Sequence, residues 1–200
     1  MRARLWRSPL RRHGVNIKTR PSAFEEALDI VRRLLAGETV SSSRRFQITQ
    51  ASIALRPAEP IEVWIGASAR PAIDRAARLA EGWIASPSLT RGEARSQADF
   101  YRERCAAYGR QPKAVVLRRD IYVGQSSSEA QAVLQHALTR GYRGMPAEAL
   151  VAGSVDEVAE QFRSFVELGY TDILVRHLGN DQPKVLGSLE RLAAVRAALA

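Results

Sequence analysis

A short stretch of small and basic residues, placed between an apolar run and a helical pattern, is the part of this sequence best suited to bind a ligand. Its five residues are Gly66, Ala67, Ser68, Ala69 and Arg70. The apolar run before it, residues 61–65, is typical of a buried parallel strand, and Pro71 suits the first turn of a helix. Free N–H groups at a helix start bind anions, so the stretch predicts a phosphate site.

Two side chains of the stretch add to this prediction. Ser68 is expected to cap the helix, and Arg70 would supply a positive charge beside a phosphate. An alternative stays open, because a tight turn between a strand and a helix favours small residues even when it binds nothing.

Arg176 and His177 end the last predicted strand, and both are expected to face the same pocket. Arg176 would contact a cofactor phosphate or an acidic substrate, or else form a structural salt bridge. His177 titrates near neutrality, so it is a weak catalytic candidate that would position substrate or move a proton. Ordinary packing is the alternative for His177. No spacing of His, Cys, Asp and Glu predicts a metal site.

Regular patterns indicate the elements that position these residues. Strands are predicted near residues 61–65, 82–85, 115–123 and 171–176. Helix starts are predicted by S-x-x-E capping boxes at Ser22, Ser126 and Ser154, and helix ends by Gly37, Gly141 and Gly169. Apolar residues follow each start at helical spacing, including Phe24 and Val31 in the first of these helices, and they predict core faces. Residues 141–153 are predicted to be a loop or insertion, and Trp64 and Trp83 either flank the ligand or pack in the core.

Several segments in this order resemble the luciferase-like flavin-dependent oxidoreductases, a TIM-barrel family that uses flavin mononucleotide (FMN) or the deazaflavin F420. The resemblance extends over roughly residues 13–198, and its motifs lie at 24–40, 61–84, 153–159, 168–175 and 186–192. It implies that Gly66, Ala67, Ser68, Ala69 and Arg70 hold the cofactor phosphate. Ala67 stands where the family often has a hydroxyl group.

Length limits how much of the family's barrel this chain can form. A (β/α)8 barrel needs about 250 residues, so the predicted fold class is α/β, a partial barrel of about the last four βα units. We expect residues 13–200 to form this half-barrel after a basic leader over residues 1–12. Open sheet edges need cover, which predicts either a homodimer or association with a missing N-terminal half.

Composition narrows the class of protein. The chain is 46% hydrophobic and 26% charged, with no run long enough to cross a membrane, and its single cysteine, Cys105, is expected to pack in a reducing cytoplasm. The net charge is +9, but seven basic residues and no acid lie within residues 1–20. No recognition motif follows this arm, so nucleic-acid binding is not the predicted function.

Together these features predict a cytoplasmic oxidoreductase acting on a small organic molecule. The resemblance implies a monooxygenase that uses reduced FMN and oxygen, or alternatively hydride transfer with F420. In the family, groups that contact the substrate come largely from the first half of the barrel, which leaves the catalytic residues unassigned here. The alternative is a non-catalytic half-barrel that binds a phosphate-bearing ligand or a partner chain.

Overall fold

The computed structural model describes residues 17–199, and the chain divides after Ile61 into two units. The N-terminal unit covers residues 17–61 and the C-terminal unit covers residues 62–199 of the described chain. The predicted leader over residues 1–12 lies outside the described residues.

The N-terminal unit consists of one helix and a short antiparallel hairpin. Its elements are α2 (Arg20–Leu35), β1 (Val40–Ser42) and β2 (Ile48–Ala51). The predicted capping box at Ser22 is wrong, because Pro21 fits the first turn and Thr19 becomes the N-cap. The Ser22 hydroxyl instead donates to the Thr19 carbonyl. The predicted core stripe of this helix is also wrong at two positions, since Phe24 and Val31 are exposed.

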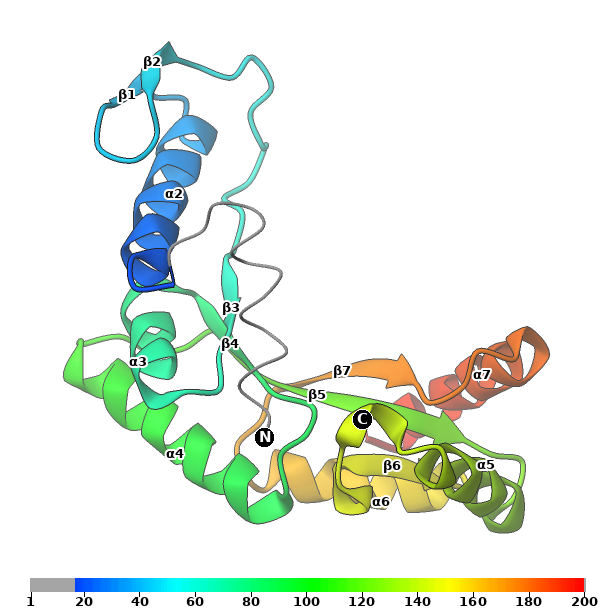
Figure 1. Cartoon of the computed structure of the whole chain (residues 1–200). Coiled ribbons are helices and arrows are strands. Elements are labelled where there is room, and N and C mark those ends of the chain that lie inside the picture. The colour runs from blue at the N-terminus through cyan, green and yellow to red at the C-terminus, as the bar shows by residue number, and fades with distance from the viewer. Residues whose placement is uncertain (1–16, 200) are drawn as a thin grey trace. The chain divides into compact units, whose positions relative to one another are not determined.

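The C-terminal unit is an α/β fold whose sheet is parallel throughout (Figure 1). Its strands are β3 (Trp64–Gly66), β4 (Gly82–Ala85), β5 (Ala114–Val123), β6 (Leu150–Gly153) and β7 (Asp172–His177). Its main helices are α3 (Arg70–Leu79), α4 (Arg91–Ala107), α5 (Ser127–Thr139), α6 (Val155–Val166) and α7 (Gln182–Leu199). All four predicted strands are present, with bounds shifted by up to three residues.

The long strand β5 holds the sheet together. Residues 114–117 pair with β4 and residues 120–123 pair with β6, while residues 116–121 pair with β7. Because the β7 pairing overlaps both others, β7 lies along one edge of β5, and β4 and β6 follow one another along the opposite edge. This arrangement places the ends of β3 and β4 beside each other, and the end of β7, at His177, beside Ile121 near the carboxyl end of β5.

One element of the sheet was not predicted. The segment 141–153 was expected to be a loop, but its last four residues form the buried strand β6, so that prediction is wrong there. Two short 3₁₀ turns, at Tyr142–Gly144 and Ala147–Ala149, precede the strand. A run of four residues within a glycine-rich stretch carries too little periodicity to be distinguished from a loop.

The predicted start and end signals of α5 and α6 are confirmed. Ser126 and Ser154 accept hydrogen bonds from the N–H groups of Glu129 and Glu157, and Ser154 forms the full capping box. The glycines after α5 and α6, Gly141 and Gly169, have positive φ angles of 66° and 80°, which suits glycine at a helix end. One face of β5 lies in the core under the helices. Its core residues are Val115, Leu117, Ile121 and Val123.

An ion pair joins α3 to α4 and supports a prediction about pH. The Arg104 side chain donates to Asp74, and together with Tyr108 it lowers the pKa of that carboxyl below its ordinary 3.8. A lowered pKa stabilises the folded chain above pH 3.8, and this contribution is lost as the pH falls through the folded-state value. Because the pair is partly exposed, Asp74→Asn should cost on the order of 0.5 kcal/mol at pH 7. Urea unfolding at pH 7 and pH 3 measures this, and an equal cost at both values would contradict it.

Candidate functional site

The predicted phosphate loop lies at the carboxyl end of β3, where the sheet meets α3. Gly66 is exposed there, and a Cβ atom added to it would have no heavy atom within 4 Å. The Ala67 N–H group donates to the Ile84 carbonyl of β4 at 3.2 Å. Hydrogen bonding to β4 therefore extends to the Ala67 N–H group, and open space lies beside Gly66.

Helix α3 starts one residue later than its predicted cap. Ala69, not Ser68, is the N-cap, and no side chain caps the helix. The reason is that the Ala69 carbonyl accepts from the N–H groups of both Ala72 and Ile73. Ser68 and Ala69 are exposed, so the start of α3 faces outward without a side-chain oxygen of its own.

Arg70 extends from this loop toward the helix layer. Its guanidinium carbon lies 4.8 Å from the ring centre of Phe100 in α4, a cation–π distance. A shallow cleft around it is bordered by Gly92, Arg95 and Asp99 of α4. Arg70 is thus positioned by Phe100 at the first turn of α3.

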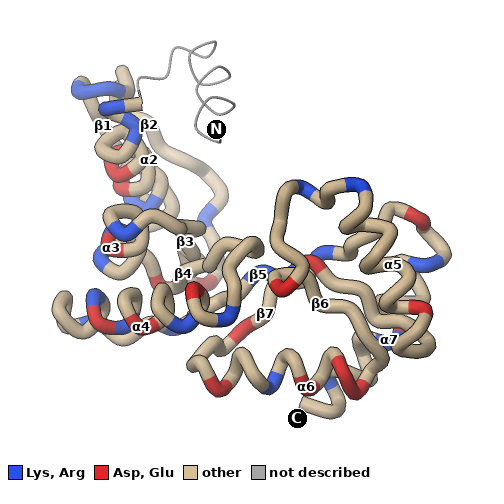
Figure 2. Tube along the Cα trace, turned by 60° about the horizontal axis from the view of Figure 1, so that its bottom comes forward, with Lys and Arg blue, Asp and Glu red and all other residues tan. Residues whose placement is uncertain are grey.

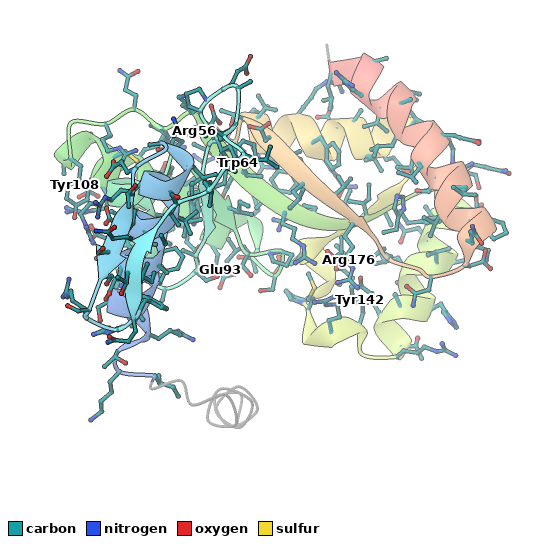
Figure 3. All side chains as sticks on the ribbon, turned by 90° about the horizontal axis from the view of Figure 1, so that it is seen from above. Arg56, Trp64, Glu93, Tyr108, Tyr142 and Arg176 are labelled. Atoms are coloured by element: carbon teal, nitrogen blue, oxygen red, sulfur yellow. The ribbon has the colours of Figure 1, made fainter. Side chains whose placement is uncertain are left out.

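Arg176 and His177 lie on opposite faces of β7, as the alternation of a strand requires, so the expectation that they face one pocket is wrong. Arg176 is exposed and pairs in register with Asp120 of β5. Figure 3 shows Arg176 next to Tyr142. The Tyr142 hydroxyl donates to Asp120 at 2.8 Å, and Arg118 lies 3.4 Å from the same carboxylate.

These four residues, Arg118, Asp120, Tyr142 and Arg176, form a charged cluster on the face of β5 opposite the main core. Asp120 is fully buried, so its two donors compensate for the water it loses. Burial and the hydrogen bond to Asp120 raise the pKa of Tyr142 to about 12, which keeps the hydroxyl protonated as a donor. Figure 2 marks basic and acidic residues next to one another along β5.

A larger cleft includes Tyr142 in its lining. It encloses about 790 Å³ between α5 and the segment that joins β7 to α7, a size typical of small-molecule sites. Val133 and Leu178 supply apolar contacts, and His136 and Lys184 supply polar groups. The predicted phosphate loop does not contribute to its lining.

His177 points to the helix-covered side of β7. Both of its ring nitrogens are buried and have no hydrogen-bond partner among residues 17–199. Burial lowers the pKa of the imidazole below its ordinary 6.5, so the neutral ring is favoured in the folded chain. Its catalytic role stays a prediction, and its surroundings favour packing.

Replacing His177 with phenylalanine tests that role. Under the packing interpretation, His177→Phe should leave the chain at least as stable at pH 7, because two unpartnered polar atoms are removed. Native stability should fall as the pH drops below 6.5, since the unfolded state then binds more protons. Urea unfolding at pH 7.5 and pH 5.5 should show this loss in the native chain and a smaller one in the variant. An equal loss in both would contradict it.

The charged centre of β5 is a feature that was not predicted from the sequence. Arg118, Arg119 and Asp120 are consecutive in a strand that is otherwise apolar. Charged residues are rarely buried without partners, so this triplet was the signal that could have indicated a functional or structural polar site. The two tryptophans, for which the sequence left a ligand or a core role open, differ in burial. Trp83 is fully buried, whereas Trp64 is 40% exposed.

The fold and the strand-end loop define an α/β protein with the parallel strand and helix arrangement of a TIM-type barrel. A family model described as luciferase-like monooxygenase matches residues 7–172. The chain therefore belongs to the luciferase-like monooxygenase family, which confirms the predicted resemblance.

Curated relatives carry more specific names. The chain is 26% identical to an F420-dependent glucose-6-phosphate dehydrogenase of Kribbella flavida, over 88% of this chain and 60% of the relative. It is 25% identical to the enzyme of the same name in Nakamurella multipartita, over 84% and 58%. The chain thus spans about 60% of the length of these relatives.

Solved structures support the fold. Monooxygenase RslO1 from Streptomyces bottropensis aligns with a TM-score of 0.76 and 16% identity, over 94% of this chain and 64% of its own. An F420-dependent secondary alcohol dehydrogenase aligns with a TM-score of 0.75 and 12% identity, over 92% and 63%. These likenesses confirm the predicted fold class, a partial (β/α)8 barrel. Among the described residues, no helix is both long and apolar enough to span a membrane.

Proposed function

We propose that this chain contributes to a flavin- or F420-dependent oxidoreductase and holds the cofactor phosphate at Gly66, Ala67, Ser68, Ala69 and Arg70. The observation that carries the proposal is the open strand end at Gly66, directly before the uncapped start of α3. Backbone N–H groups and the positive end of the helix dipole favour a phosphate at such a position.

The residues present fit this type of cofactor. The space over Gly66 lets a phosphate approach the backbone, and the Ser68 hydroxyl adds a donor. Arg176 lies exposed at the end of β7, where it would contact an acidic group of the cofactor or substrate. The bound cofactor supplies hydride or oxygen chemistry, and the protein orients it and excludes water.

F420 is the preferred cofactor in this proposal, and FMN is the second candidate. This order is the reverse of the one predicted from the sequence. Support comes from the F420-dependent curated relatives. A monooxygenase reaction with FMN remains the second candidate, supported by the flavin-related chains among the similar structures.

A non-catalytic role is the other candidate function. The sheet face that carries Trp64 and Leu174 is only partly covered, and these side chains are 40% and 49% exposed. Apolar surface of this kind is typical of a contact with another chain. A second copy, or a chain with the remaining strands, would then complete the site.

A fluorescence titration of the purified chain with F420, FMN and riboflavin tests the proposal. Saturable binding of a phosphate-bearing cofactor should weaken about fivefold in Arg70→Ala, a loss of about 1 kcal/mol, and also in Ser68→Ala. Arg196→Ala, an exposed change on α7, is the control and should bind normally. If neither F420 nor FMN binds, or if riboflavin binds equally well, the phosphate site is refuted.

A further inference from the structure

Trp83 holds the loop after β3 from inside the core. Its side chain is fully buried, and its indole N–H donates to the Ala67 carbonyl at 2.9 Å. The ring lies against Tyr101 and Tyr170, with centroid distances of 5.1 and 6.3 Å. Packing on two rings fixes the direction in which the indole donates.

This bond also sets the direction of the next N–H group. In a trans peptide the carbonyl of one residue and the N–H group of the following residue point in opposite directions. The Ala67 carbonyl points inward to Trp83, so the N–H group of Ser68 points away from the core. The buried tryptophan thereby orients a backbone donor of the proposed phosphate site.

Arg119 holds the loop after β4 in a similar way. Its side chain is fully buried and lies over Phe165, 4.7 Å from the ring centre. The guanidinium donates to the Pro87 carbonyl at 3.1 Å and to the Leu89 carbonyl at 3.0 Å. Both carbonyls belong to the segment that joins β4 to α4.

The surroundings of Arg119 are unusual for a buried cation. Within the described part of the chain, no carboxylate forms an ion pair with it, and its Nε atom has no hydrogen-bond partner. Carbonyl oxygens and an aromatic ring are its main compensation, and burial lowers its pKa to about 10. A positive charge left without a protein anion favours an anion at the neighbouring strand ends.

The two loops are neighbours, because β3 and β4 pair in parallel with Trp64 opposite Gly82 and Gly66 opposite Ile84. We infer that Trp83 and Arg119 are positioning residues that fix the two strand-end loops and so preorganise the phosphate site. The phosphate part rests on the proposed function, whereas the fixing of the loops does not.

Hydrogen exchange of the ligand-free chain tests the fixing directly. Trp83→Phe keeps an aromatic ring but removes the donor, and exchange of the Ala67 N–H group, which is bonded to the Ile84 carbonyl, should accelerate about tenfold or more. Arg119→Met should accelerate exchange in residues 86–90 in the same way. Tyr122→Phe is the matched control, because it also removes the hydrogen-bond donor of a buried ring, but on the opposite face of β5. Unchanged exchange at Ala67 in Trp83→Phe would overturn the inference, even if Arg119→Met does not fold.

Cofactor titration gives the second readout. The ratio of FMN to riboflavin affinity should fall about fivefold in Trp83→Phe and stay unchanged in Tyr122→Phe, because only the former alters the phosphate loop. A ratio that stays unchanged in Trp83→Phe would overturn the link to the phosphate. If the native chain binds no cofactor, the proposed function fails, and hydrogen exchange alone decides whether Trp83 and Arg119 fix the loops.

Discussion

Replacing Gly66 with leucine should strongly weaken cofactor binding and leave the fold intact. The new side chain would enter the open space over the strand end, where no protein atom lies within 4 Å of the added Cβ. A phosphate at this position would collide with it, so affinity should fall by about 30-fold or more, equivalent to about 2 kcal/mol. Fluorescence titration with F420 and FMN measures the loss.

Gly179 provides the control for this experiment. It lies in the segment that joins β7 to α7, and a Cβ there also meets no heavy atom within 4 Å. Gly179→Leu should therefore fold and bind the cofactor normally. Circular dichroism and thermal unfolding should show both variants folded. Native-like binding by Gly66→Leu would place the phosphate elsewhere and contradict the proposed site.

Removing the hydroxyl of Tyr142 should have the largest effect on stability among the single-atom changes considered. The hydroxyl is one of two donors to the fully buried Asp120 carboxylate, and the other donor, Arg118, is more distant at 3.4 Å. Tyr142→Phe should cost about 2 kcal/mol, because a buried charge loses a hydrogen bond. The thermal midpoint should fall by about 5 °C.

Tyr108 makes a comparable bond in an exposed setting. Its hydroxyl lies 3.1 Å from each carboxylate oxygen of Asp74. Tyr108→Phe should cost less than about 0.5 kcal/mol, because water replaces the lost donor. Equal losses of unfolding free energy in Tyr108→Phe and Tyr142→Phe would contradict the role of Asp120 burial. A double-mutant cycle with Asp120→Asn and Tyr142→Phe measures the coupling between the two side chains.

The order of strands and helices in the C-terminal unit could largely be predicted from the sequence, because local signals agreed with the fold. The apolar run before Gly66 and the proline after Arg70 predicted a strand, a turn and a helix, and all three are present. The prediction that this strand is buried is wrong, because Trp64 and Gly66 are exposed. Ser154 with Glu157 predicted a helix start that the structure confirms. Each of these signals depends on neighbours within a few residues.

Other features could not be predicted from the sequence, because they depend on tertiary contacts. The sequence around Trp64 and Trp83 is similar, yet register and the covering helices expose one ring and bury the other. The sequence alone does not distinguish Ser68 from Ala69 as the N-cap of α3. The extended backbone of Ala69 makes this residue the N-cap. The partners of Arg119 lie about 30 residues earlier in the chain, so no local pattern names them.

The placement of β5 also has a consequence for synthesis of the chain. A ribosome releases β5 well before β6 and β7, whose residues pair with β5 residues that lie 30 and 56 positions earlier. During that interval the edge of β5 that pairs with β7, and residues 120–123 of its other edge, are unpaired. Nascent chains are exposed to aggregation at such a stage, so translation pauses between residues 124 and 171 should lower the soluble yield more than pauses after His177.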